Sequence, residues 1–177
     1  MRRLMLIFLL LAVPAQGDYG VQIIEETVGF WPVTYQMWRV RVTEGGELIS
    51  QRLFMPRVRV ARAMKGPDVC VVGTDDGLWR WGLPSGTVTR VPGTEGQDCQ
   101  MLELCGVFGM PFAAYGENTH TGDPKWVMRV INVASGLWVG GPWFSPDPYF
   151  LGILPGSVWW YDHEIFLVEH LWIPLPV

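Results

Sequence analysis

Apolar and polar residues alternate over short stretches along most of this chain, and tight turns separate the stretches. VRVARAM (58–64), DVCVVG (68–73) and LWRWGL (78–83) follow one another with only KGP and TDDG between them. Short runs with a period of two, bounded by Gly, Pro and Asp, are typical of β-strands joined by hairpin turns. The pattern predicts an all-β protein.

The strand pattern recurs at a fixed interval. Pro67, Pro111 and Pro155 are 44 residues apart, and each stands between one apolar stretch and a second strand-like stretch. A polar turn follows the second stretch each time: TDDG, then ENTHTGDPK, then DH. A period of roughly 40 to 50 residues with four strands per unit is typical of the blades of a β-propeller.

The interval divides one domain, residues 18–177, into units at about 19–54, 55–97, 98–146 and 147–177. Gly45, Gly86 and Gly136 mark equivalent turns. We expect four strands in each unit, except that EIFLVEHLW is a single strand and the last unit lacks a clear outer strand. The predicted fold is a β-propeller or partial propeller of about four four-stranded antiparallel blades. We expect N-terminal strands to complete the last blade and close, or nearly close, the ring. An open partial propeller and a β-sandwich or other meander are the alternatives.

Two hairpins resemble a known family. Ile131 to Trp138 and Trp81 to Val88 are similar to the outer hairpin of kelch-type blades, in which an aromatic residue precedes a Trp across a turn of small residues. Similar hairpins occur in quinoprotein-like propellers. The chain departs from the kelch pattern at Gly73, where that family has a Gly-Gly doublet. The resemblance implies a propeller fold and carries no activity with it.

The N-terminal segment is typical of a secretory signal peptide. Arg2 and Arg3 precede an apolar run over residues 4–13, and small residues follow near Gly17. The run is about half of the roughly 20 residues that a membrane-spanning helix needs. We expect cleavage of residues 1–17 and a secreted, lumenal or periplasmic protein with no membrane span. An uncleaved anchor is the alternative.

Charge and cysteine content narrow the function classes. Thirteen Lys and Arg against 17 Asp and Glu give a net charge of −4, with no basic stripe, so the sequence predicts no nucleic-acid partner. Cys70, Cys99 and Cys105 form an odd set in an oxidising compartment, so at least one thiol stays unpaired. None of them has the spacing of a zinc site.

Polar residues of the turns form the first candidate site. In a blade, the turn after the second strand lies on the same face as the turn that enters the first strand. That face gathers carboxylates, an amide and two histidines: Asp75, Asp76, Glu117, Asn118, His120, Asp123, Asp162 and His163. Such residues suit a polar ligand or a hard cation such as Ca²⁺. The alternative is that these are the ordinary residues of turns.

An aromatic loop forms the second candidate site. GPWFSPDPYF places Trp143, Phe144, Tyr149 and Phe150 among prolines before the last unit. Aromatic rings on a rigid scaffold suit sugar stacking or protein contact, because they provide a large contact area at little entropic cost. The alternative is that these rings fill the core.

No catalytic or metal-binding residue is predicted, and no cofactor. The chain has no G-x-S-x-G motif, and its Gly-rich stretches lack the lysine of a phosphate loop. The predicted function is a secreted non-enzymatic module that binds a protein or a glycan, and open sheet edges predict self-association. A glycan-active enzyme of sialidase or oxidase type, and a propeller fragment without independent function, are the alternatives.

Overall fold

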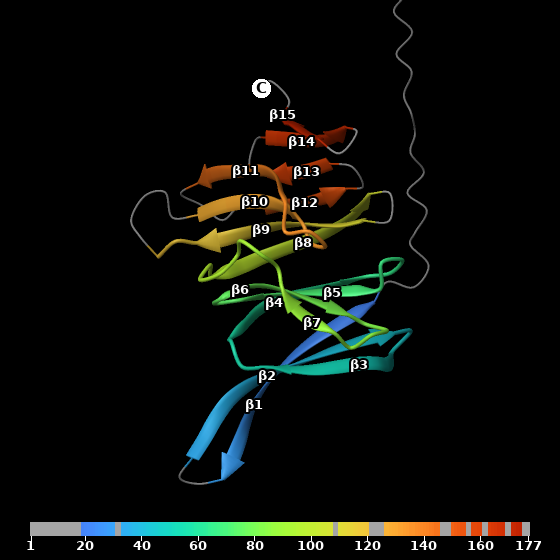
Figure 1. Ribbon diagram of the computed structural model, residues 1–177, viewed down its shortest axis with the longest axis vertical. Coiled ribbons are helices and arrows are strands. Elements are labelled where there is room, and N and C mark those ends of the chain that lie inside the picture. The colour runs from blue at the N-terminus through green and yellow to red at the C-terminus, as the bar shows by residue number, and fades with distance from the viewer. Residues whose placement is uncertain are drawn as a thin grey trace, which may run out of the picture.

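The computed structural model describes residues 19–30, 33–107, 110–120, 126–145, 150–154, 157–160, 163–168 and 171–174 (Figure 1). The predicted signal peptide, residues 1–17, lies outside the described residues. Within them the chain consists of strands and turns without a helix, which confirms the all-β prediction.

The first two sheets are formed by the N-terminal half of the chain. The first sheet has three strands in the order β1 (Gly20–Phe30), β2 (Val33–Glu44) and β3 (Glu47–Phe54). The second has four strands in the order β4 (Val58–Met64), β5 (Val69–Thr74), β6 (Gly77–Gly82) and β7 (Val88–Arg90).

The C-terminal half forms two further four-stranded sheets. The third contains β8 (Cys99–Val107), β9 (Met110–Asn118), β10 (Trp126–Asn132) and β11 (Trp138–Ser145). The fourth contains β12 (Phe150–Leu154), β13 (Ser157–Trp160), β14 (His163–Val168) and β15 (Leu171–Pro174). In every sheet each strand pairs antiparallel with the next one along the chain, so all four sheets are meanders.

Two expectations about strands were wrong. The first unit has three strands, not four, because strands of 11, 12 and 8 residues occupy nearly all of it. EIFLVEHLW is not one strand: β14 ends at Val168, and β15 begins at Leu171 and pairs back onto it. The last sheet therefore has an outer strand, β15, contrary to the expectation that it lacks one.

The sheets are layered in chain order. The first strands of successive sheets are neighbours, β1 with β4, β4 with β8, and β8 with β12. Figure 1 places the first and fourth sheets at opposite ends of the stack, and the described strands do not close into a ring. The second and third sheets are therefore inner layers, and the outward face of the first sheet is an end of the stack.

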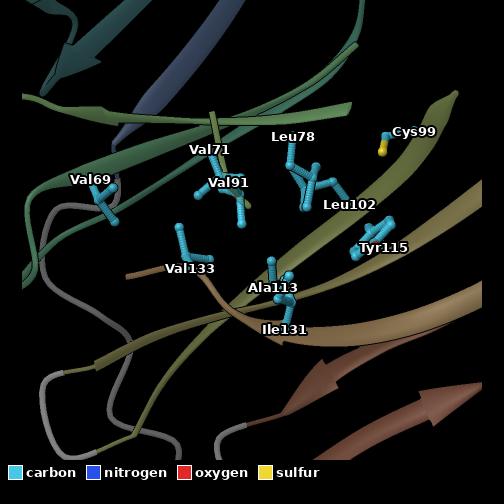
Figure 2. Packing of buried hydrophobic residues seen from close by; sticks show 10 residues of the cluster. All are labelled: Val69, Val71, Leu78, Val91, Cys99, Leu102, Ala113, Tyr115, Ile131 and Val133. Carbon is cyan, nitrogen blue, oxygen red and sulfur yellow. The ribbon is translucent and has the colours of Figure 1, made fainter. Parts of the chain in front are cut away.

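Strand β5 lies at the centre of this packing. Its side chains alternate between two cores: Cys70 and Val72 pack with Val40 of the first sheet, whereas Val69 and Val71 pack towards the third sheet. Figure 2 shows Val69 and Val71 on the same side as the core residues of the third sheet. All six residues of β5 are buried. A strand covered on both faces needs a continuous apolar run, which VCVVG supplies.

The two buried cysteines mark the two sides of the second sheet. Cys70 belongs to the core between the first and second sheets, and Cys99 to the core between the second and third. Both thiols are free and have no exposed surface. Burial raises the pKa of Cys70 to about 12 and also raises the pKa of Cys99.

Candidate functional site

Part of the predicted loop face lies at one end of the second and third sheets. The β5–β6 turn, with Asp75 and Asp76, adjoins the start of β4, because Thr74 pairs with Val58. The end of β9 adjoins the start of β8 in the same way, because Glu117 pairs with Cys99. Segment 91–98 connects the two sheets at this end and contacts both groups.

Asp75 and Asp76 are bonded within the chain. Oδ1 of Asp75 accepts a hydrogen bond of 3.0 Å from the amide of Arg57. Asp76 pairs with the guanidinium of Arg90 and accepts a hydrogen bond of 3.2 Å from the amide of Gly96. Both carboxylates therefore fix loops, and that of Asp76 ties the β5–β6 turn to the connecting segment.

Asp98 is the centre of the largest polar cluster at this end, and sequence reasoning missed it. Its carboxylate accepts hydrogen bonds from Arg59 Nε at 2.9 Å and Nη2 at 3.3 Å, and from Gln100 Nε2 at 2.7 Å. His120 Nε2 lies 2.6 Å from the second oxygen, Oδ2. Because an ionised carboxylate only accepts, Nε2 of His120 carries the proton of this bond.

The electrostatics of Asp98 follow from these contacts. Its side chain is only 7% exposed, and this burial alone raises the pKa of the carboxyl. The hydrogen bonds from Gln100, His120 and Arg59, with the charge of Arg59, outweigh the burial and hold the pKa below its usual value. Asp98 is therefore a buried carboxylate that stays ionised.

Glu117, Asn118 and His120 complete the described part of the loop face. Glu117 pairs with Arg129, whose guanidinium lies 5.2 Å from the centre of the Trp138 ring. Oδ1 of Asn118 accepts a hydrogen bond of 2.9 Å from the amide of His120. That bond supports His120 in a left-handed conformation, at φ 54°, which non-glycine residues rarely adopt.

All five described residues of the predicted face thus have partners inside the chain. Within the described ranges no group of three His, Cys, Asp or Glu is placed to hold a metal ion. Asp123 and Asp162 lie outside the described residues; His163 begins β14, and its side chain lies outside them too. The arrangement joins the second sheet to the third, so its chemistry is that of a structural clamp.

The predicted aromatic loop is partly strand. Trp143 and Phe144 belong to β11, where they pair with Met128 and Val127 of β10. Phe150 is the first residue of β12. Tyr149 lies outside the described residues. Pro142 did not prevent strand formation, because β11 is the last strand of its sheet and has one edge free of backbone pairing among the described strands.

A different surface stands out on the first sheet. Of the nine exposed large apolar side chains among the described residues, six lie on β1, β2 and β3. Val28, Val33 and Tyr35 are 39%, 53% and 58% exposed, and Val28 pairs directly with Tyr35. We call these three residues the hairpin patch. Figure 1 shows the β1–β2 hairpin projecting from the stack.

The sequence contains a signal for the hairpin patch, which lies in the order of apolar residues along β2. In β2 the apolar residues stand at 33, 35 and 37, and then at 38, 40 and 42. The β1–β2 pairing runs through this point without a register shift. Because alternate residues of a strand face opposite ways, the apolar side of β2 changes from the outward face to the core face between Met37 and Trp38.

Comparisons with known proteins identify no relative: no family model, curated protein or solved structure matches the chain. No helix in the described part of the chain has the length and apolar character to cross a membrane.

Proposed function

We propose that this chain is a non-enzymatic protein-binding module and that the hairpin patch is its contact surface. The inversion of the apolar side in β2 supports this proposal most strongly. The apolar character of Trp38, Val40 and Val42 is accounted for by their packing against the second sheet. Val33 and Tyr35 face the other way and belong to neither core cluster of the described residues.

The composition of the hairpin tip agrees with a partner on one face only. Thr34 and Gln36 lie on the face opposite the hairpin patch, as does Thr27, whose hydroxyl donates to Oε1 of Gln36 at 3.2 Å. A solvated antiparallel hairpin of this kind normally packs its apolar face on a core. An exposed apolar face is typical of a protein-interaction site.

The energetics favour a protein surface as the occupant. Burying a Val or Tyr side chain that is half exposed contributes on the order of 1 kcal/mol, so several together give a useful contact. Tyr35 is of the type that most often dominates such contacts. Beside the patch, Glu26 and Arg39 form an ion pair with bonds of 2.6 and 2.8 Å, which suits a polar rim.

We propose that the stack is an open, propeller-like arc that holds the hairpin out. The meander order of each sheet and the adjacency of β1, β4, β8 and β12 support this interpretation. In a propeller the innermost strand of each blade adjoins that of the next blade. An open arc leaves the outward face of its first sheet free for a partner.

We place the mature protein in a secreted, lumenal or periplasmic compartment because of the signal-like residues 1–17. The two buried free thiols agree with this placement, because a thiol whose pKa is raised by burial reacts slowly with oxidants. N-terminal sequencing of the protein isolated from its producing cells tests the proposal. A chain that begins after residue 17 supports it, and a retained Met1 contradicts it.

The binding proposal is tested with two variants of one strand. Val33→Asp/Tyr35→Asp places charges on the hairpin patch, and Thr34→Asp/Gln36→Asp places the same charges on the opposite face. Each is used as bait for proteins from the producing organism, and each is first checked for the wild-type melting temperature. We expect the first variant to lose the captured partner and the second to keep it. Equal capture by both variants contradicts the proposal.

A further inference from the structure

Two turns of this chain have the same backbone geometry. In the β6–β7 turn the amide of Gly82 donates to the carbonyl of Thr87 at 2.9 Å, and in the β10–β11 turn Asn132 donates to Leu137 at 2.9 Å. In both turns the glycine amide donates back to the residue at which the turn starts, at 2.9 and 2.8 Å. The side chains of the two turns can therefore be compared position by position.

The side chains differ in chemistry. A hollow of about 210 Å³ lies at the β6–β7 hairpin. Its lining residues are one glycine and four residues with polar side chains: Arg80, Gly82, Ser85, Thr87 and Thr89. The corresponding residues of the β10–β11 hairpin are mostly apolar or larger: Val130, Asn132, Ser135, Leu137 and Val139. The fold of the turn therefore does not require the arginine at position 80 or the threonines at positions 87 and 89.

The hollow follows from the strand pairing. Arg80 pairs with Thr89 across β6 and β7, so their side chains share a face, and Gly82 and Thr87 follow two residues away on that face. Gly82 leaves the space open, since a Cβ there would lie only 2.8 Å from Ser85 Oγ. In the other turn the side chain of Asn132 instead bonds the amides of Ala134 and Ser135 at 2.9 and 3.1 Å.

Arg80 has unused hydrogen-bonding capacity. Its Nε is shielded from solvent and has no hydrogen-bond partner among the described residues. No described carboxylate pairs with it, whereas Arg59 and Arg90 of the same sheet are both ion-paired. The guanidinium of Arg80 therefore lacks a counter-charge among the described residues, and an oxyanion would supply one.

We propose that this hollow, which we call the Arg80 hollow, binds a single oxyanion group: a carboxylate, sulfate or phosphate. The guanidinium supplies charged donors in a planar fork that suits such groups. The hydroxyls of Thr87 and Thr89 supply neutral donors, whereas that of Ser85 already donates to the carbonyl of Gly82 at 3.4 Å. The volume is smaller than the roughly 300 Å³ at which pockets for drug-sized ligands begin, so it suits one anionic group or one acidic sugar.

The Arg80 hollow is independent of the hairpin patch. Arg80 pairs with Val71, whose side chain packs towards the third sheet, so the hollow lies on the face of the second sheet away from the first. Binding there can succeed or fail whatever covers the first sheet.

The test is a titration followed through the arginine Nε–H resonances of the full chain by NMR. The probes are sodium sulfate, sodium phosphate, sodium acetate and sodium glucuronate, all at one ionic strength. The resonance that disappears in Arg80→Gln is assigned to Arg80. We expect that resonance to shift and saturate with at least one probe, and the responding probes tell inorganic ions from carboxylates and sugar acids.

Variants provide the controls. Arg41 also has a shielded Nε without a partner but lies outside the hollow, so Arg41→Gln should bind the probe as the wild type does. Arg80→Gln lacks the Arg80 resonance, so its binding is followed through the backbone amide of Thr87, which lines the same hollow. Arg80→Gln should weaken binding about tenfold or more, and Thr87→Val should weaken it less, because a charged hydrogen bond contributes more than a neutral one. Shifts that do not saturate, equal shifts at Arg41 and Arg80, or unchanged affinity in Arg80→Gln overturn the proposal.

Discussion

Arg59 and Asp98 join the second and third sheets through two hydrogen bonds of 2.9 and 3.3 Å. Arg59 is on β4, and Asp98 immediately precedes β8, so the pair links the first strands of two layers. The Asp98 side chain is 7% exposed and that of Arg59 25%. A two-pronged pair at this depth fixes the relative position of the two strands as well as stabilising them.

Asp98→Asn should lower the free energy of unfolding by about 2 to 3 kcal/mol, because the buried side chain of Asp98 loses its charge and the partly buried guanidinium of Arg59 loses its counter-charge. The matched control is Glu103→Gln, since Glu103 pairs with Arg62 between the same two strands at 3.0 Å but is 35% exposed. That control should cost less than about 1 kcal/mol. Urea denaturation measures both. An equal cost for the two variants would show that Asp98 is not a buried clamp.

The free energy of unfolding should depend on pH in the acid range through the titration of Asp98. The pKa of this carboxyl is lowered in the folded chain, so its stabilising contribution is fully present above the unfolded value of about 3.9. The contribution is lost as the pH falls through the folded pKa. The stability difference between wild type and Asp98→Asn should therefore shrink between about pH 5 and pH 2. A difference that stays constant over this range contradicts the assignment.

Gly77→Ala should destabilise the protein more than Gly45→Ala. Both glycines have positive φ, 113° and 59°, so both substitutions strain the backbone by about 1 to 2 kcal/mol. A Cβ at Gly77 would lie 2.3 Å from the carbonyl oxygen of Thr94, whereas nothing lies within 4 Å at Gly45. We expect at least about 3 kcal/mol for Gly77→Ala by thermal or urea unfolding. Similar costs would contradict the close approach of segment 91–98.

The thiols of Cys70 and Cys99 should not react with a disulfide reagent in the native protein. Both are buried, and the raised pKa of Cys70, about 12, leaves roughly one thiolate in ten thousand near pH 8. The measurement is the absorbance released by the reagent from a Cys105→Ser variant. Two thiols should react per chain in concentrated guanidinium and almost none without it. Rapid native reaction of either thiol would contradict the two-sided burial of the second sheet.

Most strands could be predicted from the sequence because their alternation reports burial locally. VRVARAM is β4 residue for residue, and the Gly-Gly turn at Gly45 separates β2 from β3 as expected. The first sheet was misjudged because strand length depends on pairing partners and not on local pattern. In the last unit, residues 169–170 include no glycine or proline that would predict a break in the strand.

The site was harder to predict than the fold. Asp75, Asp76 and His120 were predicted from their residue type. Residue type does not show whether an arginine or a backbone amide from a distant segment will already bind the side chain. Asp98, in the unremarkable stretch EGQDC, became the centre of the cluster only through Arg59, 39 residues away. The change of the apolar side within VTYQMWRVRV can be read from the sequence. Only the position of the second sheet shows which of the two sides faces the core.

The most direct test of the proposed contact surface compares two adjacent positions. A photo-crosslinking amino acid is placed at Tyr35 in one variant and at Gln36 in another, and each is illuminated in the cells that produce the protein. Neighbouring residues of one strand face opposite sides, so only the first probe faces the proposed partner. We predict a discrete protein adduct from position 35 that is absent from position 36. Equal adducts from both positions, or an adduct from position 36 alone, would contradict the account.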